Sequence, residues 1–187
     1  MSFLSSGTLY RYCALKIIEN KNNFNSEFIN EIAKSIKLKK LKSKKLFRPD
    51  VTKLSSMIAK KIYIRKALKN FQIEFMKNSR LVIIEGRDIG TKIMPKADLK
   101  LFFRCSNKEK INRRLKELKQ TNNEITFKEV EKALIQRDKD DTRRKISPLI
   151  MTKNAVLVDT TKLTIKQMDA KLANLVKSSI KKKYGNL

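Results

Sequence analysis

"VIIEGRDIGTKIMPKADLKLFFRC", residues 82–105, holds two short apolar runs separated by a segment rich in turn residues. The runs Leu81–Ile84 and Leu99–Phe103 have the length and composition of buried β-strands. Two of the chain's four glycines, Gly86 and Gly90, bracket an Arg-Asp pair directly after the first run. Glycine lets the backbone approach a ligand closely, and arginine can form two parallel hydrogen bonds with a phosphate or carboxylate. The segment therefore predicts a strand whose carboxyl end carries a binding turn.

Helices with one apolar face are predicted on both sides of these strands. The helical periodicity covers residues 8–20, 27–36, 51–77 (as two consecutive helices), 107–120, 127–144 and 164–183. Another buried strand is predicted at Ala155–Asp159, and the basic connector Lys37–Asp50, interrupted by Pro49, has room for short strands. Strands that alternate with helices favour an α/β fold with a parallel sheet and helices on both faces.

The composition excludes several classes of protein. There is no histidine, which argues against zinc chemistry and against a histidine general base. Two cysteines, Cys13 and Cys105, are too few for a disulfide framework or a metal cluster, so we expect a reducing, cytoplasmic setting. No stretch approaches the length of a membrane span, and the N-terminus lacks the pattern of a signal peptide.

The formal net charge of +27 has two explanations. One is binding to nucleic acid or polyphosphate, because Lys and Arg neutralise phosphates. The other is a general compositional preference for Lys, Asn and Ile, which we favour for most of the lysines. They are scattered over every segment and are not interleaved with aromatic residues as stacking platforms would be. The arginines are fewer, and their positions are the more informative signal.

The turn "GRDIGT", residues 86–91, is the first candidate site. In a parallel α/β sheet, ligands bind beyond the carboxyl ends of the strands, which is where this turn is predicted to lie. A tight turn with a local Arg–Asp ion pair explains the hexapeptide about equally well.

A second candidate lies in "QRDKDDTRRKISPL", residues 136–149. Arg137, Asp141 and Arg144 fall at i, i+4 and i+7, so they are predicted to share one helical face. Two arginines that flank a carboxylate suit a sugar hydroxyl and a phosphate. The alternative is a solvated helix with internal salt bridges of about 0.2–0.5 kcal/mol each. Because Arg before Asp is the weaker order for such a bridge, we favour a functional role.

Weaker signals come from two other segments. In "LSSGTLYR", residues 4–11, a Ser-Ser-Gly turn at a helix start could offer N–H groups to an anion, although an ordinary N-cap explains the bare motif better. Arg113 and Arg114 are adjacent on a predicted helix, so they cannot both face one point. Either could reach a phosphate when a lid closes.

The order of these pieces resembles the bacterial cytidylate kinases. The resemblance runs from Leu4 to about Leu175 through "LSSGTLYR", "SSMIAKKIYIRKAL", "IIEGRDIGT", "KADLKLFF", "NRRLKEL", "QRDKDDTRR" and "AVLVDTTKLTIKQM". It implies a P-loop nucleoside monophosphate kinase fold and transfer of the ATP γ-phosphoryl group to CMP or dCMP, with Mg²⁺. It also implies one domain over residues 1–187, with an NMP-binding region at about 37–80 and a lid at about 113–145. CMP or dCMP and ATP would be the partners of a monomer that binds neither membrane nor nucleic acid.

The same resemblance implies roles for particular side chains. By motif, Ser56, Arg65 and Asp88 would contact cytosine; Ser6, Arg11 and Arg87 would lie near the acceptor nucleotide and its phosphate; Arg137 and Asp141 would hold the sugar and phosphates, with Arg144 bridging to the transferred group; and Arg113 and Arg114 would belong to the ATP side. An aspartate at position 88 can accept a hydrogen bond from the exocyclic amine of cytosine, which uracil lacks.

The chain departs from this family in one respect. It contains no G-x-x-x-x-G-K-[ST] loop, no strand that leads into one, and no identified protein ligand for Mg²⁺. We therefore expect Leu81–Ile84 to lack a strand partner and the chain to phosphorylate CMP poorly. Three explanations are open: the residues belong to a longer, complete kinase, which we favour; the protein only binds nucleotide; or another chain supplies the loop.

Other functions remain open at this stage. One is a basic RNA-binding or ribosome-associated protein without catalytic activity, although the aspartates among the arginines fit it poorly. Another is a general interaction module that docks on an acidic partner, which only the net positive charge supports. A third is a related kinase that acts on UMP or AMP.

Overall fold

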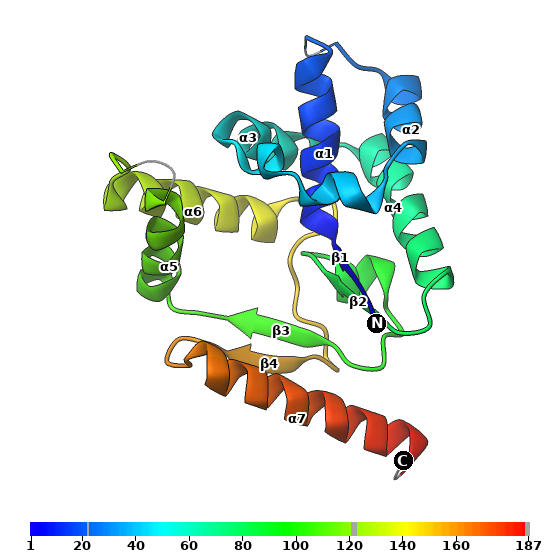
Figure 1. The fold of residues 1–187 in the computed structure, drawn as a ribbon, viewed down its shortest axis with the longest axis vertical. Helices are drawn as coiled ribbons and strands as arrows, with labels where there is room; N and C mark the ends of the chain where they lie inside the picture. Colours follow the sequence, from blue (N-terminus) through cyan, green and yellow to red (C-terminus); the bar gives the residue numbers. More distant parts are fainter. Residues whose placement is uncertain (22, 121–122, 186–187) are drawn as a thin grey trace. The chain divides into compact units, whose positions relative to one another are not determined.

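The computed structural model describes residues 1–21, 23–120 and 123–185, and the chain divides into two compact units (Figure 1). Unit 1 comprises Met1–Ile93 and Arg144–Pro148. Unit 2 comprises Met94–Arg143 and Leu149–Leu187. None of the helices in the described part of the chain is both long and apolar enough to cross a membrane.

Unit 1 is mostly helical and contains one pair of strands. Its elements are β1 (Ser2–Ser5), α1 (Ser6–Glu19), α2 (Ser26–Lys34), the 3₁₀ helices η1 (Leu38–Lys42) and η2 (Lys44–Phe47), α3 (Pro49–Ile58), α4 (Ile62–Lys77), β2 (Val82–Glu85) and the π-helical turn η3 (Ile89–Ile93).

Strands β1 and β2 are parallel and pair from Ser2 with Val82 to Ser5 with Glu85. The pairing begins with a hydrogen bond of 2.8 Å that Ser2 N donates to Leu81 O. The expectation that Leu81–Ile84 lacks a strand partner is therefore wrong. The partner is the short segment at the start of the chain, which has only two apolar residues and gave no recognisable strand pattern.

The core of unit 1 forms around α1. Leu9, Cys13 and Ile17 recur every four residues on the apolar face of the helix predicted at residues 8–20, and all three are fully buried. They belong to one apolar cluster with residues of α2, α3 and α4, among them Ile29 and Leu68. Burial of each large aliphatic side chain contributes roughly 1.5–3 kcal/mol, so this cluster supplies the main stabilisation of the unit.

Local structure in unit 1 partly follows the predictions. The single apolar pattern over residues 51–77 does form two helices, and Pro49 occupies the first turn of α3, where its missing N–H has no cost. The connector Lys37–Asp50 forms η1 and η2 and no strand among its described residues, because Leu41 and Leu46 turn into the core at a spacing that an alternating strand does not provide.

Helix α1 begins earlier than predicted. Ser5 is the N-cap residue but its side chain makes no capping hydrogen bond, and Ser6 and Gly7 already lie in the first turn. Thr8 Oγ1 donates a hydrogen bond of 2.7 Å to Ser5 O instead. The Ser-Ser-Gly turn is thus the start of the helix itself.

Gly86 is required by the close approach of β2 to the start of α1. A Cβ atom at this position would lie 3.0 Å from Ser6 Cβ and 2.9 Å from Ile89 Cδ1, whereas a Cβ at Gly7 would have Ser5 Oγ at 3.9 Å as its nearest neighbour. We expect Gly86→Ala to lower the free energy of unfolding by about 1–3 kcal/mol through overpacking. The matched change Gly7→Ala is expected to be neutral or to stabilise by up to about 1 kcal/mol, since alanine favours the helix. Urea unfolding of both variants tests the pair, and equal stability of the two would contradict it.

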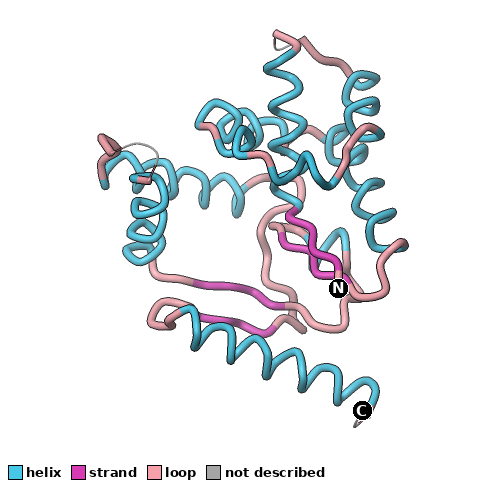
Figure 2. The backbone as a smooth tube through the Cα atoms, in the orientation of Figure 1, coloured by secondary structure: helices cyan, strands magenta, loops and turns pink. Residues whose placement is uncertain are grey.

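In its described residues, unit 2 has a second pair of strands and three helices. Its elements are β3 (Leu101–Arg104), α5 (Asn107–Lys119), α6 (Phe127–Arg143), β4 (Val156–Asp159) and α7 (Ile165–Tyr184). Strands β3 and β4 are parallel, in register from Leu101 with Val156 to Arg104 with Asp159, and Figure 2 shows both strand pairs in magenta. Parallel strands connected through helices confirm the predicted α/β class, which is consistent with a nucleoside monophosphate kinase-like fold.

The helices of unit 2 have clear local determinants. Lys110 on α5 forms an ion pair with Asp138 on α6, which ties the two helices together. Helix α7 begins with a capping box, in which Thr164 and Gln167 each accept a hydrogen bond from the other's backbone N–H. The segment "TNNEIT", residues 121–126, which separates the two helices predicted at 107–120 and 127–144, includes residues 121–122, which lie outside the described residues.

Candidate functional site

A pocket of about 160 Å³ lies within unit 1. Helix α4 supplies one wall through four residues at i, i+3, i+4 and i+7 of one helical face. The remaining lining comes from α1, the turn after β2, and residues 144–148. The lining residues are Tyr10, Ile62, Arg65, Lys66, Lys69, Asp88, Lys92, Ile93, Ile146 and Ser147.

Arg65 and Asp88 form an ion pair in this pocket, between Nη2 and Oδ2. The two side chains are only 10% and 7% exposed, so the pair is buried. Asp88 follows β2, and its partner lies 23 residues earlier in the chain, on α4. The structure thus brings together two of the predicted site residues.

The Arg65 guanidinium has two further contacts. Its Nη1 donates a hydrogen bond of 2.9 Å to Ala59 O, and its plane lies over the ring of Tyr10, 5.5 Å from the ring centroid. Burial raises the pKa of Tyr10 to about 12, an effect that the nearby Arg65 partly opposes, so its phenol is neutral at physiological pH. Tyr10 belongs to the "LSSGTLYR" motif but was not predicted as a site residue. Its position next to Arg11 in that motif could have indicated a place in the site.

Arg144 lies outside the helix that was predicted to carry it. Helix α6 ends at Arg143, and Arg144 Nε donates a hydrogen bond of 2.6 Å to Ser147 O. Ser147 has a φ of +51°, in the left-handed region, which closes a tight turn before Pro148. The prediction that Arg144 shares a helical face with Arg137 and Asp141 is therefore wrong.

Arg137 and Asp141 do share a face of α6, with 3.9 Å between Nε and Oδ2. Asp141 is the more buried of the two, its side chain being 15% exposed against 38% for Arg137. Both residues belong to unit 2. The long separation makes this a weak internal salt bridge.

Arg11 is buried in unit 1 and contacts the connector before α3. Its Nη1 donates a hydrogen bond of 3.4 Å to Leu46 O, and its guanidinium lies 4.7 Å from the centroid of the Phe47 ring. The remaining predicted residues of unit 1 are Ser6, buried in the first turn of α1; Ser56, half-buried, with its hydroxyl donating to Thr52 O at 3.3 Å; and Arg87, exposed on the turn after β2. Among the described residues, these four are not part of the pocket lining.

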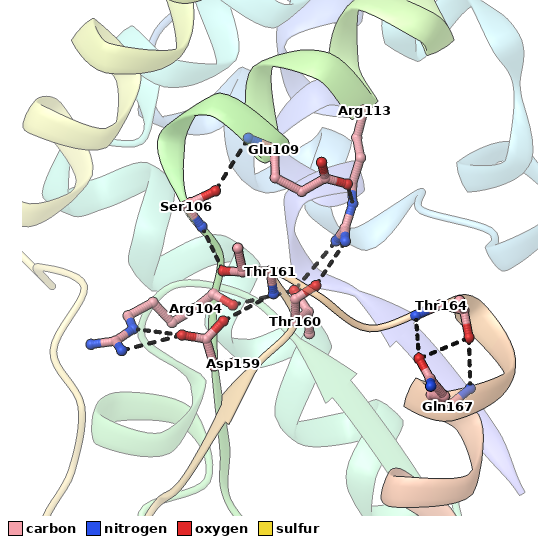
Figure 3. Close-up of polar contacts among 9 residues, drawn as sticks. All are labelled: Arg104, Ser106, Glu109, Arg113, Asp159, Thr160, Thr161, Thr164 and Gln167. Carbon is pink, nitrogen blue, oxygen red and sulfur yellow. Dashed lines mark hydrogen bonds and ion pairs between the residues drawn. The ribbon is translucent and has the colours of Figure 1, made fainter.

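Arg113 and Arg114 have different partners in unit 2. Arg113 donates from Nη1 and Nη2 to Oγ1 and O of Thr160, at 3.3 and 2.8 Å, and its Nε lies 2.7 Å from Glu109 Oε1 (Figure 3). Arg114 Nη1 lies 2.6 Å from Glu117 Oε2. As predicted, the two adjacent arginines do not face one point.

The carboxyl ends of β3 and β4 carry a polar network that was not predicted residue by residue (Figure 3). Arg104 Nε and Nη2 each donate to Asp159 Oδ2 at 3.2 Å, and Thr161 N donates to Asp159 Oδ1 at 2.9 Å. Hydrogen bonds from Thr161, with a smaller contribution from Arg104, lower the pKa of Asp159 to about 2. Ser106 N donates to Thr161 Oγ1 at 2.9 Å and so joins the start of α5 to this network.

The family model of the cytidylate kinases matches residues 1–178 of the chain. The chain belongs to the cytidylate kinase family. A cytidylate kinase of Thermosipho melanesiensis is 34% identical over 96% of this chain and 86% of its own length. Cytidylate kinases of Thermosipho africanus (34% identical, 97% of this chain and 85% of the relative) and Thermotoga maritima (31%, 93% and 84%) are similar. The resemblance noted from the motifs is thereby confirmed.

Members of the cytidylate kinase family use ATP and Mg²⁺ in general. In the described part of this chain, no group of three or more Asp, Glu, Cys or His side chains is arranged to hold a metal ion. The described residues therefore do not fit a Mg²⁺ ion held by a cluster of carboxylates.

Proposed function

We propose that this protein acts on CMP or dCMP as the acceptor of the γ-phosphoryl group of ATP. The observation that carries the proposal is the pocket of unit 1, in which a buried carboxylate, a buried guanidinium and an aromatic ring meet. The relatives named cytidylate kinase support the choice of cytosine.

The pocket has the chemistry required for a pyrimidine base. Its volume of about 160 Å³ is below the roughly 300–1,000 Å³ of sites that enclose a complete drug-sized ligand, so it suits a single ring with the rest of the nucleotide outside. Asp88 would accept a hydrogen bond from the cytosine amino group, and Arg65 holds that carboxylate in place. The Tyr10 ring offers an apolar face for the base.

The arginines would supply the positive charge that phosphoryl transfer needs. The reaction asks little covalent chemistry of a protein and depends on positioning and on stabilisation of spreading negative charge. We assign the acceptor phosphate to Ser6, Arg11 and Arg87, the sugar and phosphates to Arg137 and Asp141, and the transferred group to Arg144. Arg113 and Arg114 would serve ATP. In this proposal residues 37–80 form the NMP-binding region and residues 113–145 form the lid of a single kinase domain. Ser56 is assigned to the base by its motif alone, since it does not line the pocket.

Residues 1–187 contain no phosphate-binding loop of the form G-x-x-x-x-G-K-[ST]. Such a loop holds the β- and γ-phosphates of ATP, so we expect these 187 residues alone to bind CMP but to phosphorylate it poorly. Thermal shifts with CMP, UMP and AMP test the acceptor site, and CMP is expected to stabilise the chain most.

A coupled ADP-release assay tests the reaction itself. The 187-residue polypeptide is compared with one that also carries the in-frame coding sequence upstream of Met1. We expect turnover of CMP by the longer polypeptide and little by the shorter. A longer polypeptide that contains the loop and turns over no pyrimidine monophosphate would overturn the proposed function.

A further inference from the structure

The pocket of unit 1 carries an excess of positive charge. Its lining includes four cationic side chains and one carboxylate, Asp88, which is already paired with Arg65. Lys66 and Lys69 from α4 and Lys92 from η3 are the other three cations. The three lysines are exposed, so their ammonium groups lie toward the solvent side of a pocket whose buried part is the Arg65–Asp88 pair.

These lysines differ from others on the same protein. Lys16, Lys110 and Lys183 each form an ion pair with a carboxylate. In residues 1–21, 23–120 and 123–185, no hydrogen bond, ion pair or ring contact is made by the ammonium groups of Lys66, Lys69 or Lys92. Three like charges around one opening repel each other, and an anion that enters the opening relieves this repulsion.

We propose that Lys66, Lys69 and Lys92 form a cationic rim that draws the phosphate of a nucleoside monophosphate toward the pocket. The inference rests on the proposed function for the identity of the base. It adds three residues that attract the phosphate of the ligand and do not recognise its base. Field lines from clustered charges at a pocket raise the local concentration of an oppositely charged ligand and speed its association. A mononucleotide is favoured over an RNA strand because the pocket admits one ring and its lining contains one aromatic residue, not a series of stacking platforms.

A charge-matched pair of variants tests the rim in the 187-residue chain. One variant is Lys66→Gln/Lys69→Gln/Lys92→Gln. The control is Lys171→Gln/Lys177→Gln/Lys181→Gln, which removes the same charge from exposed positions of α7, outside the pocket lining and outside the proposed NMP-binding region and lid. The dissociation constants of CMP and of the uncharged nucleoside cytidine are measured by titration calorimetry. They are measured at about 0.01 M salt, where the Debye length is about 30 Å, and at about 1 M, where it is about 3 Å.

The rim predicts a specific pattern. At low salt the pocket variant should bind CMP about tenfold more weakly than the unchanged chain, and the control less than about twofold more weakly. The difference should vanish at high salt, and cytidine binding should be the same in all three proteins. Lys92→Gln alone should show the same pattern at about twofold, which keeps the test sound if the triple variant is poorly folded.

The alternative outcomes are separable. Equal CMP affinity of the pocket variant and the control at low salt would overturn the rim while leaving the base pocket in place. No binding of either CMP or cytidine to the unchanged chain would overturn the proposed function and the rim with it. A short single-stranded RNA is tested as a competitor of CMP. If the RNA displaces CMP, and if the three substitutions weaken RNA binding more than CMP binding, the rim belongs to nucleic acid and the proposal for a mononucleotide is overturned.

Discussion

Replacement of Arg137 by methionine is expected to lower the rate of phosphoryl transfer to CMP by about 10³-fold or more, because the proposed function places its guanidinium against phosphates whose negative charge spreads during the reaction, where an arginine contributes about 10³–10⁵ in rate. Arg137 shares a face of α6 with Asp141, and 3.9 Å separates Arg137 Nε from Asp141 Oδ2. The rate is measured as kcat in the coupled ADP-release assay, with the polypeptide that turns over CMP.

Arg143→Met provides the matched control for this prediction. It removes the same type of side chain from the same helix at an exposed position, and it is expected to change kcat by less than about threefold, as is usual for substitutions at an exposed surface. Equal losses in the two variants would mean that the overall charge of α6 matters and that Arg137 has no particular role.

The second large effect is expected at Asp88. Asp88→Asn keeps the volume of the side chain but leaves the Arg65 guanidinium buried without its counter-charge, which typically costs about 3–5 kcal/mol of stability. Asp50→Asn is the control, since Asp50 also pairs with an arginine, Arg48, but the two side chains are 45% and 51% exposed. We expect that variant to lose less than about 1 kcal/mol.

Urea unfolding without nucleotide measures both aspartate variants, so the result does not depend on the proposed function. A double change, Arg65→Met with Asp88→Asn, should recover part of the loss because no unpaired charge is then buried. A loss at Asp88 as small as that at Asp50 would contradict a buried, energetically coupled pair. Thermal shifts give a second readout. The unchanged chain should be stabilised more by CMP than by UMP, and Asp88→Asn should remove this difference.

Most of the regular structure was predictable from apolar periodicity. The buried face of α1 was assigned correctly, and residues 81–84 and 99–103 do form strands, with bounds that differ from β2 and β3 by one or two residues. Such differences are expected, because element ends depend on capping and pairing and not on the apolar pattern. The prediction that these strands are buried is wrong, since Ile83 and Phe103 are 44% and 51% exposed. The alternation of strands and helices predicted the α/β class, and the resemblance to the cytidylate kinases added the nucleoside monophosphate kinase fold.

Two elements could not be predicted from local sequence. Strand β1 exists because Ser2–Ser5 pairs with a strand about 80 residues later, and a four-residue segment with two apolar side chains carries no sign of that partner. The connector Lys37–Asp50 is rich in lysine and has no clear apolar pattern. Its structure is set by Leu41 and Leu46, which are buried in the core of unit 1. Tertiary contacts overrode local pattern in both cases.

Some residues of the candidate site were predicted from the sequence, and others were misplaced or missed. Arg65 and Asp88 were paired in one function through motif resemblance, and the structure places them in one ion pair. Arg144 was misplaced because counting i, i+4 and i+7 assumes an unbroken helix, whereas the left-handed Ser147 and the following Pro148 belong to a turn. Tyr10 was overlooked because an aromatic residue on a buried helix face is usually only part of the core.

The contacts of Arg65 have a consequence for how selectively the pocket could work. Asp88, the Ala59 carbonyl and the Tyr10 ring together restrain a side chain that would otherwise sample many rotamers. Ordering such a side chain costs up to about 2 kcal/mol, and here that cost falls on folding, before any ligand arrives. The Arg65 and Asp88 side chains would then be preorganised for one base, and they would not rearrange to fit a base of different hydrogen-bonding pattern.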